Sequence, residues 1–201
     1  MNETKERILH ASLELFAQRG VDGVSIADIT AKVGIAKSSL YAHFDGKEAI
    51  LEDILNLYRT SIAERTVDPG AYDRLLQEMS PEDFWNGIID RYLDTWSAGS
   101  LYLINRLIVL EQYKTEQALE LILEETGRIL GLSKMIFARM VELQLVQPQP
   151  PEDLSRGLAY AIRGMLMEYD VLAAHGRDTT AIVEAMRGFV HSFCSKIAIH
   201  G

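Results

Sequence analysis

The sequence predicts an all-α fold of nine or ten helices, and three observations lead to that prediction. Apolar residues recur at three- and four-residue spacing through most of the 201-residue chain, as they do in helices with one buried face. Helix start and stop signals bound these segments, and no segment shows the strict alternation of a half-buried strand. The composition, 48% hydrophobic and 24% charged, is typical of a globular protein.

The first four helices are predicted from their boundary residues. Ser25 with Asp28, and Asp45 with Glu48, have the spacing of a capping box, in which two side chains satisfy the free amides at a helix start. Gly34 is expected to end a helix, because glycine readily adopts the left-handed conformation found there. The helices are expected over about residues 2–19, 25–33, 36–43 and 46–65.

The rest of the chain is predicted as further helices separated by proline and glycine. Pro69-Gly70 is expected to break the chain. Ser80-Pro81-Glu82-Asp83 combines a capping serine, a proline and an acid in the order that opens a helix. Gln147-Pro148-Gln149-Pro150-Pro151 is expected to be a stiff connector. The helices are expected over about residues 81–96, 100–112, 115–125, 127–146, 152–175 and 179–198.

Residues 25–44 are expected to form two short helices around a tight turn, the layout of a helix-turn-helix. The second of these helices carries small polar, basic and aromatic residues in place of a long apolar face. Lysine and serine side chains bind phosphates and base edges, and tyrosine packs on the sugar-phosphate backbone. The exposed residues of this helix are predicted to be Lys37, Ser38, Ser39, Tyr41 and His43. A small core beneath it is predicted from Leu15, Phe16, Val24, Ile26, Ile29, Val33, Ile35, Leu40 and Phe44.

The charge is distributed unevenly along the chain. The net charge is −9, yet residues 1–47 hold six basic and six acidic side chains, so the whole excess lies in residues 48–201. An acidic body would be repelled by phosphate and would leave the neutral amino-terminal segment as the contact face for DNA. The total charge fits an ordinary acidic cytoplasmic protein equally well, so the asymmetry permits DNA binding without establishing it.

Residues 4–51 resemble the head motif of the tetracycline-repressor (TetR) family of bacterial transcription regulators. The resemblance is carried by Phe16-Ala17-Gln18-Arg19-Gly20, by Val24-Ser25-Ile26-Ala27-Asp28-Ile29, and by Ser39-Leu40-Tyr41-Ala42-His43-Phe44 followed by Lys47-Glu48 and Leu51. Ala36 stands where a capping serine or threonine is common, and Ser38 where glycine is common, which leaves the base preference open. Beyond residue 51 only length and helix pattern match.

This resemblance implies a DNA-binding head and a ligand-binding, dimerising body. The positions that match DNA contacts of the family are Ser25, Lys37, Ser38, Ser39, Tyr41, His43 and Lys47. The domains are expected at residues 1–47 and 48–201. A small molecule bound in the body would move the helix near residues 46–65 and change the separation of two heads.

The last two helices carry apolar stripes that are predicted to form a four-helix dimer interface. Packing within one subunit is the alternative interpretation of the same stripes. A two-fold dimer would place its recognition helices in successive major grooves, roughly 34–36 Å apart, on a near-palindromic operator. The interface residues are predicted to be Leu158, Ile162, Met165, Tyr169, Ile182, Met186, Phe189 and Phe193.

Aromatic and polar residues between the head and the last two helices are candidates for a small-molecule cavity, although the same residues also suit an ordinary core. Glu111 and Glu168 would favour a cationic ligand if they pointed into such a cavity. The candidates are Trp85, Tyr92, Trp96, Tyr102, Asn105, Arg106, Tyr113 and Phe137.

Other classes of function find little support in the sequence. The single cysteine, Cys194, excludes an internal disulfide framework. No metal-ligand spacing, nucleophile elbow or phosphate-binding loop is present, so we expect no metal, no cofactor and no enzymatic activity. No apolar run reaches the roughly 20 residues of a membrane span, and the charged start is unlike a signal peptide; a cytoplasmic location is therefore expected.

The sequence favours a dimeric repressor that binds operator DNA and is released by a small-molecule effector. A helix-turn-helix activator or protein-interaction module without ligand response is the main alternative. The effector, the operator sequence and the regulated genes are not readable from these residues.

Overall fold

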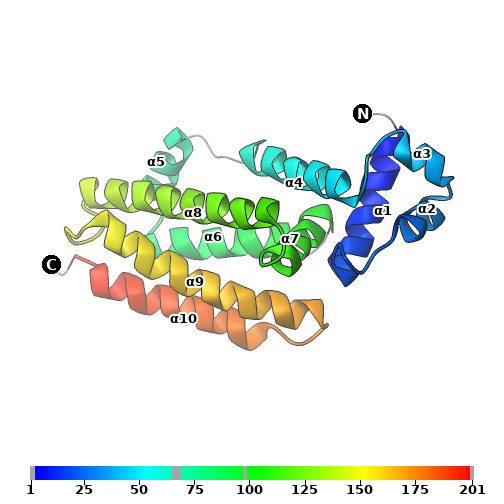
Figure 1. Cartoon of the computed structure of the whole chain (residues 1–201). Coiled ribbons are helices and arrows are strands. Elements are labelled where there is room, and N and C mark those ends of the chain that lie inside the picture. The colour runs from blue at the N-terminus through cyan, green and yellow to red at the C-terminus, as the bar shows by residue number, and fades with distance from the viewer. Residues whose placement is uncertain (1–2, 65–68, 97–98, 200–201) are drawn as a thin grey trace. The chain divides into compact units, whose positions relative to one another are not determined.

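The computed structural model describes residues 3–64, 69–96 and 99–199, and every regular element in these ranges is a helix (Figure 1). The all-α prediction is therefore confirmed. The helices are α1 (Glu3–Arg19), α2 (Ile26–Val33), α3 (Lys37–Tyr41), α4 (Lys47–Glu64), α5 (Pro69–Glu78), α6 (Pro81–Trp96), α7 (Gly99–Glu111), α8 (Glu116–Glu142), α9 (Pro151–Ala174) and α10 (Thr180–Ile197).

Two of the predicted boundaries are wrong. No helix was predicted over residues 69–78, where the structure has α5; Pro69-Gly70 begins this helix, since proline is well accommodated in the first turn of a helix. The helices expected over 115–125 and 127–146 are one continuous helix, α8. A glycine at position 127 costs that helix only about 1 kcal/mol, which packing along α8 outweighs.

The chain divides into two compact units. The first comprises residues 1–66 and 95–124, and the second comprises residues 67–94 and 125–201, so that α8 contributes to both. The expected functional boundary at residue 47 differs from this division, because α4 and α7 pack with the head. That boundary remains a prediction about function.

In the first unit, α1 packs against α2, α4 and α7. Its core takes fully buried side chains from each of these helices, among them Ile8, Phe16, Ile29, Ile54 and Leu107. The predicted head core is confirmed: Leu15, Phe16, Val24, Ile29, Val33, Leu40 and Phe44 are buried, and Ile26 and Ile35 are half-buried. The head is thus a three-helix unit stabilised from one side by α4 and α7.

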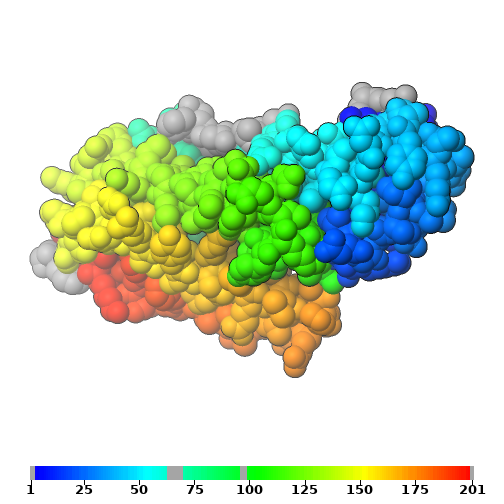
Figure 2. All heavy atoms as spheres, in the orientation of Figure 1, coloured from blue at the N-terminus to red at the C-terminus, as the bar shows by residue number. Residues whose placement is uncertain are grey.

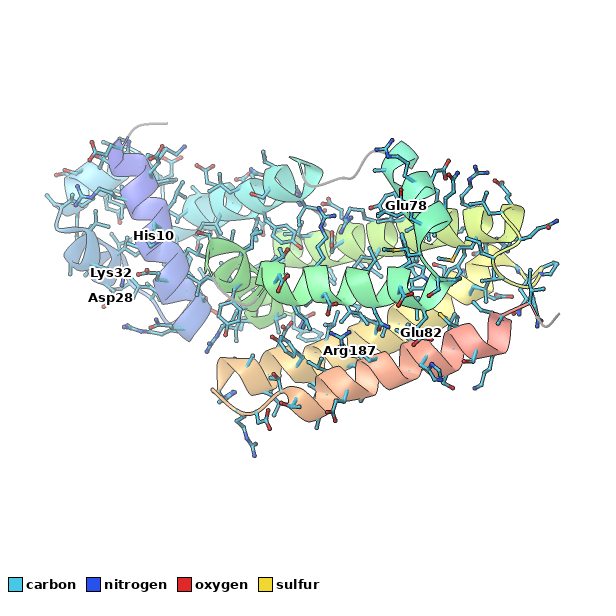
Figure 3. The ribbon with its side chains drawn as sticks, turned by 180° about the vertical axis from the view of Figure 1, so that it is seen from behind. His10, Asp28, Lys32, Glu78, Glu82 and Arg187 are labelled. Atoms are coloured by element: carbon cyan, nitrogen blue, oxygen red, sulfur yellow. The ribbon has the colours of Figure 1, made fainter. Side chains whose placement is uncertain are left out.

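In the second unit, α9 and α10 run side by side in opposite directions (Figure 1). A continuous apolar core joins them to α5, α6 and the second half of α8. Aromatic rings form its centre: Trp85 lies 4.9 Å from Phe137, and Phe137 lies 6.0 Å from Phe193, measured between ring centroids. Ion pairs such as Arg187 with Asp90, 2.6 Å apart, connect α10 to α6 at the surface; Figure 3 labels Arg187 on α10.

Within the described residues, no helix combines the length and the apolar character that a bilayer span needs.

Candidate nucleic-acid interface

The start of α2 is fixed by the predicted capping box. The Ser25 hydroxyl accepts a hydrogen bond from the amide of Asp28 at 3.1 Å, and the Asp28 carboxylate accepts from the Ser25 amide at 2.8 Å. The Ser25 hydroxyl also donates to that carboxylate at 2.6 Å. These bonds stabilise the ionised form, so the pKa of Asp28 lies below its ordinary value. The Ser25 side chain therefore serves the helix start.

The turn between α2 and α3 depends on Gly34. Its φ of +75° lies in the left-handed region, and its amide donates to the carbonyl of Thr30 at 2.9 Å. A side chain at this position would strain the backbone. The chain reverses within residues 34–36, and α3 begins at Lys37 without a side-chain cap on Ala36. This short turn holds α3 across the end of α2.

The helix α3 has one buried side chain and an exposed polar face. Leu40 is completely buried and attaches the helix to the head core. Lys37, Ser38 and Tyr41 are exposed, with 53% of Tyr41 accessible to solvent. Ser39 and His43 are half-buried. Figure 2 shows the segment containing α2 and α3 at the surface of the first unit, and Lys37, Ser38 and Tyr41 are accessible there.

Most basic side chains of residues 1–47 are engaged within the fold. Lys5 pairs with Asp53 at 2.7 Å, and Lys32 of α2 pairs with Glu14 at 2.8 Å. This pairing, through a hydrogen bond and the charge of Lys32, lowers the pKa of Glu14. Figure 3 marks Lys32 beside His10 of α1. Their partners leave these cations less available to DNA.

Lys37 and Arg19 differ from the other basic side chains of the head. Lys5 and Lys32 form ion pairs, and Arg7 and Lys47 donate to backbone carbonyls, whereas within the part of the chain that the structure describes neither Lys37 nor Arg19 makes an ion pair or a side-chain hydrogen bond. An exposed and unpaired cation can meet a phosphate or a guanine edge without first losing a partner. Lys37 therefore has the best-placed positive charge on the exposed face of α3.

Lys47 was predicted to contact DNA, and in the structure its side chain also forms a hydrogen bond within the head. Its ammonium group donates a hydrogen bond to the carbonyl of Val21 at 2.8 Å, which connects the first residue of α4 to the loop after α1. An ammonium has three donors, so this bond leaves others for a phosphate. The contact itself remains a prediction.

Glu111, the last residue of α7, has a structural role that no sequence pattern predicted. Its carboxylate is 1% exposed and accepts a hydrogen bond from the amide of Val21 at 2.9 Å, with Lys114 at 3.5 Å. A Cβ on Gly20 would lie 2.8 Å from the Glu111 carboxylate oxygen, so only glycine leaves room for this contact. We call Glu111, Val21 and Lys47 the Val21 clamp, because both polar backbone atoms of Val21 are held by side chains.

Glu111 is thus a structural acceptor for the head, and the suggestion that it would favour a cationic ligand stays a prediction. Glu168, the other residue of that suggestion, is exposed on α9. The only sequence signal for the Val21 clamp is Gly20 at the end of α1, and a glycine at a helix end is too common to indicate a carboxylate 90 residues away.

The predicted effector residues are divided between the two units, and in the second unit the ring centroids of Trp85 and Phe137 lie 4.9 Å apart. Their role in binding an effector stays a prediction. Tyr113 is 91% exposed. Trp85 and Phe137 are buried in the core of the second unit, where Tyr92 donates to Asp170 at 3.3 Å. Tyr102, Asn105 and Arg106 are half-buried on α7 of the first unit. The side chain of Trp96 lies outside the described residues.

The predicted dimer residues mostly face the core of their own subunit. Leu158, Ile182 and Met186 are buried, so they have little surface left for a partner. Ile162, Met165, Tyr169, Phe189 and Phe193 are partly buried against the same core. The exposed apolar residues of α9 are their neighbours Tyr160, Met167 and Val171, 53%, 59% and 61% exposed. Packing within the subunit therefore buries most of the two apolar stripes, and their part in a dimer interface stays a prediction.

Comparison with known proteins gives the same family for the head. Residues 8–54 match the model described as bacterial regulatory proteins, tetR family. The chain is 44% identical over 48 residues to IcaR of Staphylococcus aureus, a negative transcriptional regulator of the biofilm operon icaADBC. Such matches cover 24% to 29% of this chain and only 20% to 26% of those relatives' own lengths.

Solved structures match over nearly the whole chain. A tetR-family regulator from Mesorhizobium loti has a TM-score of 0.67 at 21% identity, covering 98% of this chain and 97% of its own. A transcriptional regulator from Saccharomonospora viridis, solved in complex with choline, has a TM-score of 0.67 at 19% identity and covers all of both chains. At these identities the likeness establishes the fold.

Proposed function

We propose that the chain is a dimeric transcriptional repressor of the tetR type, whose family model residues 8–54 match, and that it binds a near-palindromic operator through α3. The observation that carries the proposal is the uncovered face of α3. Lys37 and Tyr41 are exposed on it, while Leu40 holds it to the head. A helix placed in this way can enter a major groove with its polar side chains toward base edges and phosphates.

We further propose that α9 and α10 form the dimer interface. Tyr160, Met167 and Val171 recur at helical spacing on one face of α9, and soluble proteins seldom leave such an apolar face uncovered. A Cβ on Gly164 or Gly188 would meet no atom within 4 Å, so the subunit itself gives no reason for glycine there. Close approach of a second subunit would provide one.

The proposed release mechanism uses helices of the first unit. The Val21 clamp connects the loop after α1 to α7 through Glu111 and to α4 through Lys47. A small molecule that displaced α4 or α7 would thereby move the head. Because two heads must fit two grooves together, a shift of a few ångströms would cost most of the bivalent affinity.

The operator proposal is tested by a Tyr41→Ala variant in gel mobility-shift titrations with operator DNA from the promoter of the neighbouring genes. Loss of a groove contact should weaken binding by about tenfold or more. Tyr113→Ala is the matched control, because it removes a more exposed tyrosine of the same unit outside α3. Equal affinity of both variants and the wild type would contradict the role of α3.

The effector proposal is tested by thermal-shift screening of metabolites and lipophilic cations, including choline. A ligand that raises the melting temperature and releases operator DNA would support it. The absence of any such ligand in broad libraries would favour a regulator without a small-molecule response. We place the protein in the bacterial cytoplasm, where its operator would be found.

A further inference from the structure

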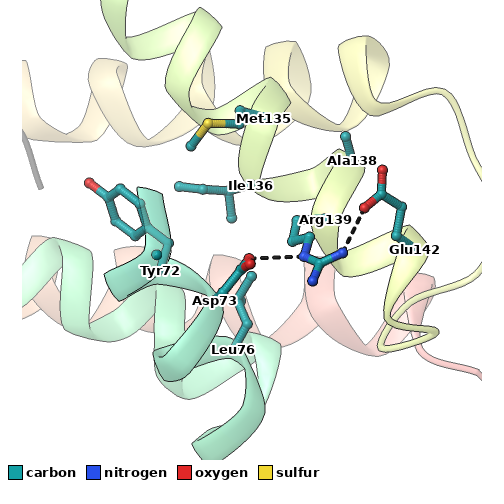
Figure 4. Close-up of a pocket in the computed structure, with 9 residues that line it drawn as sticks. Tyr72, Asp73, Leu76, Met135, Ile136, Ala138, Arg139 and Glu142 are labelled. Atoms are coloured by element: carbon teal, nitrogen blue, oxygen red, sulfur yellow. Dashed lines mark hydrogen bonds and ion pairs between the residues drawn. The ribbon is translucent and has the colours of Figure 1, made fainter. Parts of the chain in front are cut away.

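A cleft of about 310 Å³ lies between α5 and the second half of α8, within the second unit. Its size is at the lower end of the range of small-molecule sites. None of the aromatic residues expected to bind an effector lines it. The lining residues are Gly70, Tyr72, Asp73, Leu76, Met135, Ile136, Ala138, Arg139 and Glu142 (Figure 4).

The floor of the cleft is apolar. Leu76 and Ile136 belong to the buried core of the unit, and the Tyr72 ring is also buried, which raises the pKa of its hydroxyl. Met135 beside them remains 40% exposed. A flexible thioether next to a buried apolar floor adapts readily to ligands of different shape. The floor would therefore accept an apolar group.

The rim of the cleft is charged and carries an excess of negative charge. Arg139 Nε lies 2.9 Å from Asp73, and Arg139 Nη1 lies 2.8 Å from Glu142 (Figure 4). Both carboxylates raise the pKa of the guanidinium, which stays charged. Two carboxylates around one guanidinium leave a formal charge of −1. An anion would have to displace a carboxylate from Arg139, whereas a cation would meet the excess charge directly.

Floor and rim lie on two sides of the same opening. Figure 4 shows Tyr72 on one side of Ile136 and the Asp73–Arg139–Glu142 ion pairs on the other. An aromatic ring can also attract a cation through its face. We propose that this cleft is a binding site for a small organic cation with an apolar body, such as an aryl or alkyl ammonium ion. The site goes beyond the proposed operator binding and does not depend on it.

The test uses the full chain labelled with ¹³C at the methionine methyl groups, titrated with benzyltrimethylammonium and followed by NMR. The Met135 resonance, assigned with a Met135→Leu variant, should shift saturably. Phenylacetate and benzyl alcohol carry a similar ring with negative or no charge, and they should bind several-fold more weakly. Added salt should weaken only the cation, because the rim is exposed and screened.

The double variant Asp73→Asn, Glu142→Gln keeps the shape of the rim and removes its negative charge. Each exposed carboxylate is worth about two- to fivefold in affinity, so the cation should bind about tenfold more weakly. Asp90→Asn is the matched control, since Asp90 forms a similarly exposed arginine pair with Arg187 away from the cleft. Arg139→Gln should retain cation binding.

Three outcomes would overturn the proposal: no saturable Met135 shift, tighter binding of phenylacetate, or unchanged cation affinity in the double variant. Operator binding is measured separately by gel shift. Failure of the cleft and failure of the repressor proposal are therefore distinguishable.

Discussion

The helices α3 and α9 both leave a row of side chains uncovered, but the chemistry of the two rows is opposite. The exposed residues of α3 include Lys37, Ser38 and Tyr41. All three side chains can form hydrogen bonds, and that of Lys37 is positively charged. Those of α9 include Met167 and Val171, each about 60% exposed and purely apolar. Water solvates the first row well and the second poorly.

This difference indicates different partners for the two surfaces. A polar surface with an unpaired cation fits the hydrated, anionic DNA backbone. The apolar face of α9, with open space at Gly164, fits another apolar face, and a second copy of the same chain offers one. The predictions below test this contrast, beginning with the largest expected effect.

The first prediction places charge on the apolar face of α9. The double variant Met167→Lys, Val171→Lys should be monomeric, because two desolvated ammonium groups in each subunit would oppose dimer formation. Without the second head, operator affinity should fall by about a hundredfold or more. Light scattering after size-exclusion chromatography gives the mass, and gel shifts give the affinity.

The control for this experiment is Leu123→Lys, which charges an equally exposed apolar residue on α8. It should leave both the mass and the operator affinity unchanged. A dimeric α9 variant would remove this face from the proposed interface.

The second prediction concerns the Val21 clamp, which connects the loop after α1 to α7 and α4. A Glu111→Ala variant leaves the amide of Val21 without its acceptor, which should lower the free energy of unfolding by about 1–3 kcal/mol. Denaturant unfolding gives the loss, and hydrogen exchange at the Val21 amide shows its location. Glu111→Gln retains an acceptor oxygen and should recover most of the stability. Equal stability of Glu111→Ala and the wild type would show that α7 does not hold the head.

The third and smallest effect is at the capping box that begins α2. Removing the hydroxyl in a Ser25→Ala variant should cost about 1 kcal/mol at neutral pH. Because the folded pKa of Asp28 is lowered, this stabilisation is present above its ordinary value of 3.8 and is lost as the pH falls through the folded pKa. Unfolding measured from pH 7 to pH 3 should therefore show the two proteins converging in acid.

Ser38→Ala is the matched control for the capping experiment, since Ser38 is an exposed serine on α3. Its stability should equal that of the wild type at every pH. A pH-independent difference between Ser25→Ala and the wild type would contradict the role of the ionised Asp28 carboxylate.

Helix boundaries were predictable where the residues that set them are close together in the sequence. The boundaries of α2 were predictable because Ser25, Asp28 and Gly34 act within a few residues of one another. The start of α6 followed in the same way, with the Ser80 hydroxyl accepting the Asp83 amide at 3.1 Å. By contrast, Pro69-Gly70 begins α5 where a break was expected. A proline fits both the start of a helix and a break, so the local signal was ambiguous there.

The sequence by itself determined the helical class, the helix-turn-helix and the polar character of α3. These depend on spacing and short-range hydrogen bonds. Only the tertiary structure decided that Glu111 holds Val21, that Tyr113 is exposed, and which face of α9 the subunit leaves uncovered. Those outcomes depend on contacts between distant residues, and an apolar stripe does not indicate whether its own chain or another one will bury it.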